Sequence, residues 1–173
     1  MSFVYHKDEK KAQKPANMKK IVILGVGNVL LKDEGVGIHV IHALQDSLLP
    51  DNVHLEIIDG GTSPNVFHLL ERADKLIIID AVRGGSDPGS VYRFRADDVI
   101  PEGKDIVSLH QVGLLESLEM MEHMENKPKD VVIIGVEPKE MGWGLELSSE
   151  LEQTVPQIVE VVLQEVTEEA RKC

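Results

Sequence analysis

The stretch Lys75-Leu-Ile-Ile-Ile-Asp80-Ala81 places four consecutive apolar residues between a lysine and a carboxylate. A run that is apolar at every position, rather than at alternate positions, is typical of a strand buried on both faces of a sheet. Similar short runs occur at 21–25, 53–58 and 131–136. A more exposed strand is expected at 90–94, after a turn-rich loop at 84–89.

Helical spacing of apolar residues separates these runs, over 36–48, 64–72, 109–124 and 148–170. Alternation of buried strands and helices predicts a three-layer α/β/α sandwich with a mostly parallel, twisted sheet. In the last helix, Ser149 and Glu152 have the spacing of a capping box. Pro156 lies inside the same stretch and predicts a kink or a restart of the helix.

Length and composition predict one folded domain. The chain has 173 residues, of which 42% are hydrophobic and 28% charged, so it can bury one substantial core. Its net charge of -12 repels phosphate backbones and argues against a nucleic-acid partner. Six lysines lie in residues 1–20, where no apolar periodicity is found, so we expect a flexible lysine-rich tail over 1–18 and a single domain over 19–173.

The cysteine content and the hydropathy of the sequence predict the cellular compartment of the protein. The only cysteine is Cys173, which excludes an internal disulfide or a cysteine-rich zinc site. The longest uncharged apolar stretch, 21–31, is about half the length that a membrane span needs, and the N-terminus lacks the apolar core of a signal peptide. We therefore expect a cytoplasmic protein with no membrane partner.

Two carboxylates follow the first strand, in a glycine-rich loop. Gly25 and Gly27 suggest a dinucleotide fingerprint, but Leu30 stands where its third glycine is needed. Asp33 and Glu34 lie where the helix begins, and their negative charge opposes a bound pyrophosphate. On these residues alone, capping of the helix is favoured over a role in binding.

Carboxylates also end two other strands. Asp80 closes the run quoted above, where an unpaired buried charge would be costly, so it needs a partner. Acceptance of backbone N–H groups in the following turn and a functional role are equally compatible with this position. Asp59 holds the equivalent place in Asp59-Gly-Gly-Thr62, whose glycines predict a loop with a backbone that can come close to another chain.

His110 lies at a loop-to-helix junction and is the third candidate. Glu34, Asp80 and His110 together would give the mixed oxygen and nitrogen ligation that suits a divalent ion, although spacing alone does not show that they meet. His39 and His42 share a helix face, but packing or solvent exposure is favoured for them. No serine-hydrolase elbow or zinc-protease helix motif is found, so a metal-linked hydrolase is the best chemical interpretation.

Five blocks resemble the nickel-iron hydrogenase maturation endopeptidases, in the order that this family has. They are Gly25-Val-Gly-Asn-Val-Leu-Leu-Lys-Asp-Glu-Gly-Val-Gly37, Asp59-Gly-Gly-Thr62, Ile78-Ile-Asp-Ala81, Leu109-His-Gln-Val-Gly113 and Gly135-Val-Glu-Pro138. They span nearly everything after Lys19. The lysine-rich tail has no counterpart in the resemblance.

The resemblance implies an α/β peptidase domain that removes a C-terminal extension from the hydrogenase large-subunit precursor after nickel insertion. It implies that Glu34, Asp80 and His110 are the catalytic, metal-contacting residues, that Asp59, Gly60, Gly61 and Thr62 bind the precursor, and that the nickel is carried by the precursor. No organic cofactor is expected. Three alternatives remain open. They are a non-catalytic chaperone for the immature large subunit, a nucleotide-binding protein, which Leu30 and the acidic first loop disfavour, and another peptidase with a related α/β core, such as a germination-type peptidase, which the segment His110-Gln-Val-Gly113 disfavours.

Overall fold

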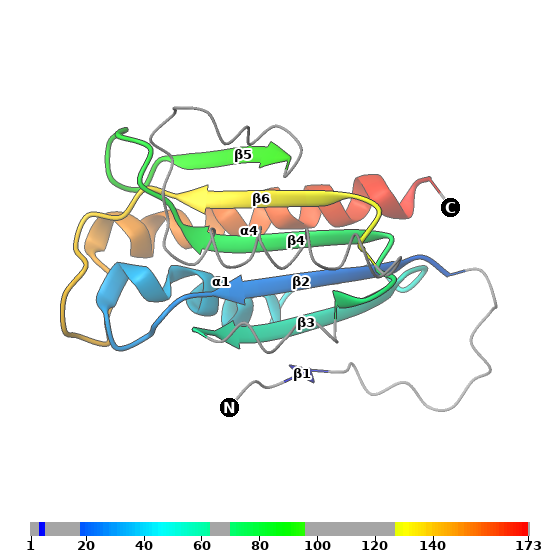
Figure 1. Cartoon of the computed structure of the whole chain (residues 1–173), viewed down its shortest axis with the longest axis horizontal. Helices are drawn as coiled ribbons and strands as arrows, with labels where there is room; N and C mark the ends of the chain where they lie inside the picture. Colours follow the sequence, from blue (N-terminus) through cyan, green and yellow to red (C-terminus); the bar gives the residue numbers. More distant parts are fainter. Residues whose placement is uncertain (1–3, 6–17, 63–69, 96–126, 173) are drawn as a thin grey trace.

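The computed structural model describes residues 4–5, 18–62, 70–95 and 127–172. Its centre is one six-stranded sheet with the strand order β1-β3-β2-β4-β6-β5 (Figure 1). The strands are β1 Val4–Tyr5, β2 Lys20–Val26, β3 His54–Gly61, β4 Lys75–Ala81, β5 Val91–Arg95 and β6 Val131–Val136. The apolar runs therefore form the strands that the sequence predicts.

The four inner strands are parallel, and the two outer ones are antiparallel to their neighbours. β2 pairs in parallel with both β3 and β4, and β4 pairs in parallel with β6. The carboxyl ends of these four strands therefore lie along one edge, which we call the carboxyl edge. β1 pairs antiparallel with β3.

Within the tail predicted over 1–18, the structure describes Val4, Tyr5 and Met18. The other residues of the tail lie outside the described residues, so its flexibility stays a prediction.

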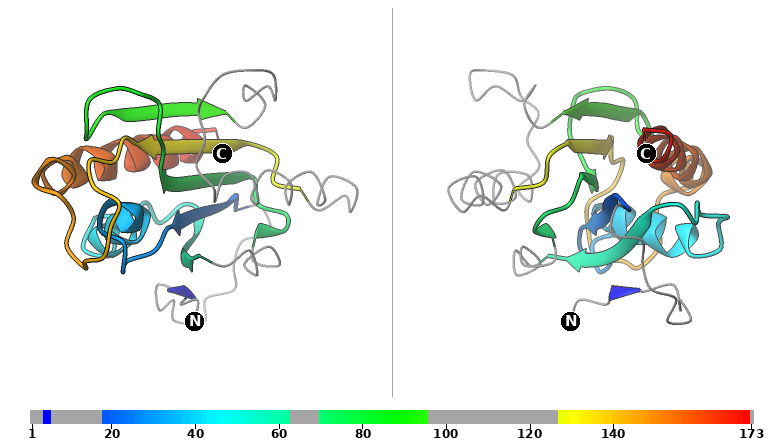
Figure 2. Two further views of the ribbon diagram at one scale, coloured as in Figure 1. Left: turned by 60° about the vertical axis from the view of Figure 1, so that its left-hand side comes forward. Right: turned by 90° about the vertical axis from the view of Figure 1, so that its right-hand side faces the viewer.

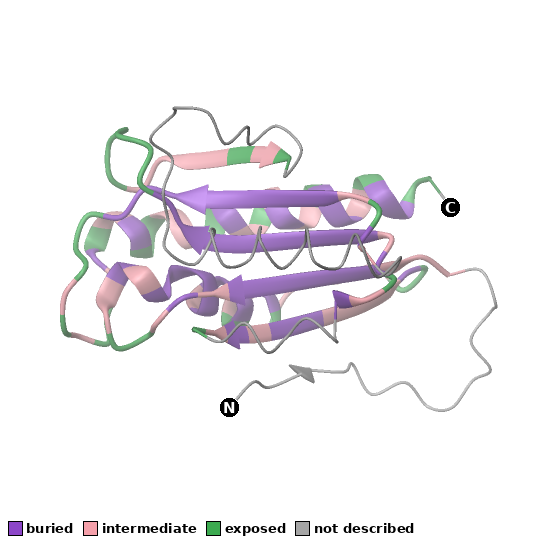
Figure 3. Ribbon diagram, viewed as in Figure 1, coloured by how far each residue is buried: buried purple, intermediate pink, exposed green. Residues whose placement is uncertain are grey.

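Two helices cover one face of the sheet (Figure 2). They are α1, Val36–Leu44, which follows a short 3₁₀ turn η1 at Lys32–Gly35, and α4, Ser149–Ala170. Their apolar stripes pack on the side chains of β2, β4 and β6 that point to this face, in one buried cluster. Figure 3 shows β2, β4 and β6 buried along most of their length, whereas β3 is buried at Ile57, Ile58 and Gly60.

The opposite face of the sheet is also apolar. Its side chains form a second buried cluster that includes Leu24, Ile78 and Ile133, with Leu70 and Ala73 packed on it. A sheet that is apolar on both faces needs a layer on each side. Almost all of the helices predicted at 64–72 and 109–124 lies outside the described residues. The predicted fold class, an α/β fold with a mostly parallel sheet, is confirmed.

Three details of the helices differ from the sequence-based expectations. α1 ends at Leu44 and not near residue 48, because the amides of Gln45 and Ser47 bond three residues back in tighter turns. The prediction of a capping box at Ser149 and Glu152 is wrong, because α4 has Ser148 as its N-cap and the Ser149 hydroxyl donates to Glu150. Pro156 does not restart the helix, since α4 is assigned as one helix across it.

Two ion pairs of Glu165 fix α4 to the sheet. The ammonium of Lys75, at the start of β4, lies 2.6 Å from Oε2 of Glu165, and both residues are almost fully buried. The Arg93 guanidinium on β5 pairs with the same carboxylate. Burial alone would raise the pKa of Glu165, but hydrogen bonds and ion pairs with Arg93 and Lys75 hold that pKa below its usual value. The carboxylate therefore remains charged and links α4 to two strands.

Candidate functional site

The loop between β2 and α1 packs directly on the ends of the strands. Gly27 has a φ of +138°, and a Cβ there would lie 1.9 Å from the carbonyl oxygen of Glu34. A Cβ at Gly37 would lie 2.3 Å from the carbonyl oxygens of Ile79 and Val26. The glycines at 27 and 37 thus allow close packing of the backbone. They hold η1, which carries the half-buried Glu34, in contact with β4.

Asp33 has a structural role that the sequence did not reveal. Its side chain is fully buried and does not cap α1, whose first turn contains no acidic residue. Its Oδ2 accepts the backbone N–H groups of Lys139 and Glu140, at 2.9 and 2.8 Å, and the hydroxyl of Ser148 at 2.9 Å. Its Oδ1 accepts the backbone N–H of Ser148 at 2.7 Å. Asp33 therefore fixes the connection from β6 to α4 against the loop that carries Glu34.

Asp80 lies near the carboxyl end of β4 and is 1% exposed. Its Oδ1 accepts the N–H of Ala81 at 2.8 Å, a backbone contact made at the last residue of β4 and not in the following turn. Alternation along the strand points Asp80 to the face opposite α1, because Ile79 and Ala81 pack in the cluster that includes α1. One carboxylate oxygen thus stabilises the chain where it leaves the strand.

Asp59, Gly60 and Gly61 form the end of β3 and not a loop, so this expectation is wrong. The pairing of β3 with β2 shifts here: Asp59 lies opposite Gly25 and Gly61 opposite Val26, with Gly60 as the extra residue of a bulge. The N–H of Gly61 donates to Oδ1 of Asp59 at 3.0 Å. Gly60 allows β3 to approach β2 closely, since a Cβ on Gly60 would lie 2.9 Å from the carbonyl oxygen of Gly25. An approach to another chain stays a prediction.

Glu137 is a further carboxylate of the carboxyl edge that sequence reasoning did not single out for a role. Its Oε2 accepts the Tyr92 hydroxyl at 2.6 Å and the N–H groups of Gly84 and Gly85 at 2.7 and 3.0 Å. Burial alone would raise the pKa of Glu137, but these hydrogen bonds keep the pKa below its usual value. Glu137 therefore holds the connection that follows Asp80. In the sequence, the signal for a role of Glu137 is its position directly after the buried strand β6.

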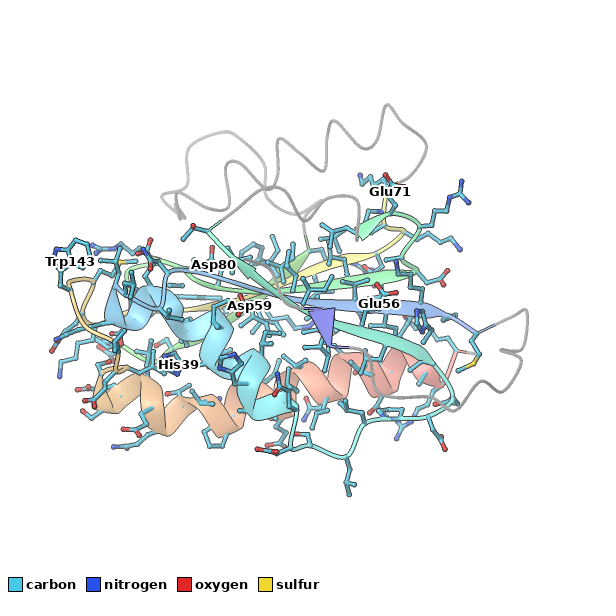
Figure 4. The ribbon with its side chains drawn as sticks, turned by 90° about the horizontal axis from the view of Figure 1, so that it is seen from below. His39, Glu56, Asp59, Glu71, Asp80 and Trp143 are labelled. Atoms are coloured by element: carbon cyan, nitrogen blue, oxygen red, sulfur yellow. The ribbon has the colours of Figure 1, made fainter. Side chains whose placement is uncertain are left out.

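The third candidate ligand, His110, lies outside the described residues. Within the described ranges, no group of three or more His, Cys, Asp or Glu side chains is placed to hold a metal ion. The structure places Glu34 and Asp80 on two elements in contact, η1 and β4, at one edge of the sheet. Figure 4 shows Asp80 and Asp59 in the same region of the molecule, well away from Glu71. A set completed by His110 stays a prediction.

The sequence favoured packing or solvent exposure for His39 and His42, and the structure agrees. His42 is exposed, while His39 is half-buried, and Figure 4 shows it where α1 borders α4. Its buried Nε2 has no hydrogen-bond partner among the described residues. Burial, followed by the charge of His42, lowers the pKa of His39 below 6.5.

The folded chain therefore resists protonation of His39, which gives a pH prediction. Between the lowered pKa and 6.5 the unfolded chain binds the proton more readily, so the free energy of unfolding falls as the pH drops below 6.5. The His39→Phe variant should lose this part of the pH dependence in urea unfolding between pH 7 and about pH 5. His42→Gln, at the exposed neighbour, should keep most of it. Identical slopes for wild type and His39→Phe would contradict the prediction.

Comparison with known proteins decides the family. The model of the HycI hydrogenase maturation protease family matches residues 38–165. The chain belongs to this family. HupD, a hydrogenase expression/formation protein of Bradyrhizobium diazoefficiens, is 34% identical over 154 residues, which are 86% of this chain and 79% of HupD. The hydrogenase 2 maturation protease of Escherichia coli is 33% identical over 147 residues, 83% of this chain and 88% of that relative.

The hydrogenase maturation proteases also share the fold. The structure of the hydrogenase maturating endopeptidase HybD from E. coli superposes with a TM-score of 0.77 and 32% identity, covering 87% of this chain and 93% of HybD. The family and the protease activity predicted from the sequence are confirmed: the chain is a hydrolase of the hydrogenase maturation protease family. In the part of the chain that the structure describes, no helix has the length and apolar character needed to span a bilayer.

Proposed function

We propose that this protease removes the C-terminal extension of a nickel-iron hydrogenase large subunit after that precursor has received its nickel. The observation that carries the proposal is the placement of Glu34 and Asp80 at one edge of the sheet, on elements that contact each other, in a chain of this family. His110 completes the proposed set. We expect the reaction to take place in the cytoplasm, with no nucleic acid involved.

The proposed chemistry uses the nickel as part of the substrate. Carboxylate oxygens and an imidazole nitrogen are ligands that a divalent first-row metal accepts, and a metal-polarised peptide carbonyl is a better electrophile. A water molecule then attacks the carbonyl carbon while Asp80 or Glu34 accepts its proton. The carbon–nitrogen bond breaks, the new carboxyl end stays on the large subunit, and the proton passes to the leaving amine.

Residues 59–62 are proposed to contact the precursor beside this set. Gly61 and Thr62 lie where β3 leaves the sheet, and Thr62 is exposed. The bulge at Gly60 and the hydrogen bond from Gly61 to Asp59 give this segment a fixed backbone before any substrate arrives. A preformed surface loses less entropy on binding, which favours docking of a protein segment.

Incubation with purified precursor tests the function. Nickel-loaded precursor should become shorter on a denaturing gel, by the length of its extension, whereas nickel-free precursor should keep its length. A nickel-loaded precursor that binds the chain and remains full length would overturn the proposed cleavage and support the chaperone alternative. Equal cleavage of nickel-loaded and nickel-free precursor would overturn the proposed role of nickel in the reaction.

A further inference from the structure

Large exposed apolar side chains gather in two loops at the carboxyl edge. They belong to the loop after β2 and the connection from β6 to α4, and are Val29, Leu30, Met141, Trp143 and Leu145, which we call the apolar rim. Among the described residues, one other large apolar side chain is exposed, Leu48. Trp143 is 83% exposed, and Figure 4 shows it at the end of the molecule that lies away from Glu71.

The rim is built on a paired backbone. The N–H of Gly144 donates to the carbonyl of Leu30 at 3.0 Å, and the N–H of Lys32 donates to the carbonyl of Gly144 at 2.9 Å. These bonds set Trp143 and Leu145 beside the loop of Leu30. The Asp33 carboxylate also holds the connection from β6 to α4, through the four hydrogen bonds described above. The apolar side chains are therefore presented on a fixed frame, which favours binding.

The rim lies on or contacts the chain segments that leave β2 and β4, next to the two carboxylates of the proposed site in the sequence. Leu30 lies four residues before Glu34 on the same loop. The Arg83 guanidinium, three residues after Asp80, donates to Sδ of Met141 at 3.1 Å. An open hollow of about 330 Å³ extends alongside, lined by Lys32, Glu140 and residues 144–148. A polypeptide bound at this edge of the sheet can therefore extend over the rim.

Two ion pairs flank the rim, and the exposed Glu146 lies within it. Lys32 pairs with Glu140, and Lys139 lies 2.7 Å from Glu150. On a chain with a net charge of -12, the rim is an apolar area flanked by matched ion pairs. Two copies of so acidic a chain repel each other, which disfavours a second copy as the occupant. An exposed tryptophan beside leucine and methionine is the composition of an interface core.

We infer that the apolar rim is the docking surface for large apolar side chains of the hydrogenase large-subunit precursor, with Trp143 as its anchor. This inference rests on the proposed function and names the surface that recognises the partner of the same site. The rim acts by affinity and takes no part in bond cleavage. Truncation of Trp143 therefore weakens binding of the precursor and leaves the chemistry of the bound complex unchanged.

The test compares Trp143→Ala with Leu48→Ala, which removes a side chain that is 98% exposed in the connection between α1 and β3. Cleavage is measured against the concentration of nickel-loaded precursor. For Trp143→Ala we expect at least about a tenfold rise in the half-saturating concentration, with the saturated rate within about twofold of wild type. Leu48→Ala should match wild type in both. An unchanged half-saturating concentration for Trp143→Ala would overturn the inference.

Two further measurements separate the possible failures. If wild type binds the precursor without cleaving it, the proposed function fails, and calorimetric binding of the precursor to wild type and Trp143→Ala still tests the rim. If sedimentation shows a wild-type dimer that Trp143→Ala dissociates, a second copy occupies the rim and the inference is overturned. A melting temperature of Trp143→Ala close to wild type ensures that the comparison concerns docking and not folding.

Discussion

The Asp80→Asn variant should process nickel-loaded precursor at least about a hundredfold more slowly than wild type, the lower range for loss of a general acid or base. Asparagine has the same shape and keeps Oδ1 as the acceptor for the N–H of Ala81, which lies 2.8 Å away. The strand end is therefore preserved. Asparagine lacks the negative charge with which Asp80 would bind a metal or accept a proton. Single-turnover cleavage at saturating precursor measures this effect.

The matched control for Asp80 is Asp87→Asn, in the connection that follows the same strand. Asp87 is exposed, and the hydrogen bond that its backbone carbonyl accepts from the N–H of Ser90 does not involve its side chain. This control should cleave at the wild-type rate. Wild-type cleavage by Asp80→Asn would remove Asp80 from the proposed site. Loss of cleavage in both variants would point to a general effect of charge on precursor binding.

Asp33→Asn should lower the free energy of unfolding by about 3 kcal/mol, as measured by urea denaturation. The carboxylate accepts hydrogen bonds on both of its oxygens, from the N–H groups of Lys139, Glu140 and Ser148 and from the hydroxyl of Ser148. Asparagine replaces one of these oxygens with an NH₂ group, which faces N–H donors. At least one buried donor then loses its acceptor, and an amide–amide repulsion is added.

The control for Asp33 is Glu34→Gln, one residue further along the same turn. Glu34 is half-buried, so we expect a much smaller change in its unfolding free energy. Its cleavage of nickel-loaded precursor should nevertheless be severely reduced, because Glu34 belongs to the proposed site. The two neighbouring carboxylates would thus separate into a structural and a functional one. A stable Asp33→Asn protein would contradict the role of Asp33 in holding the connection from β6 to α4.

The inner strands could be predicted from sequence because their signal is local. A continuous apolar run, such as the one before Asp80, marks a strand that is buried on both faces whatever its neighbours are. Parallel pairing of such strands then places the residues at their ends along one edge. For this reason the general positions of Glu34, Asp59 and Asp80 were predictable. The motifs that resemble the hydrogenase maturation proteases predicted the protease activity, which the comparisons confirm.

The roles of Asp33 and Glu137 were not predictable, since their partners lie far away in the sequence. Asp33 accepts hydrogen bonds from residues more than a hundred positions further along the chain, and Glu137 accepts them from the connection after β4. The capping-box prediction failed for the same reason. The helix starts one residue earlier than the motif suggests, and the Ser148 hydroxyl donates to Asp33 instead of capping the helix. Local patterns carry no information on such tertiary competition.

Anomalous diffraction from crystals of the chain soaked in a nickel salt tests most directly whether Glu34, Asp80 and His110 converge. The added ion stands in for the nickel of the precursor. We predict one nickel peak bound by all three side chains, at the distances of about 2.0–2.2 Å that nitrogen and oxygen ligands make to divalent metals such as zinc. A nickel peak bound elsewhere, or a structure in which the three side chains lie on separate faces, would contradict the proposed site.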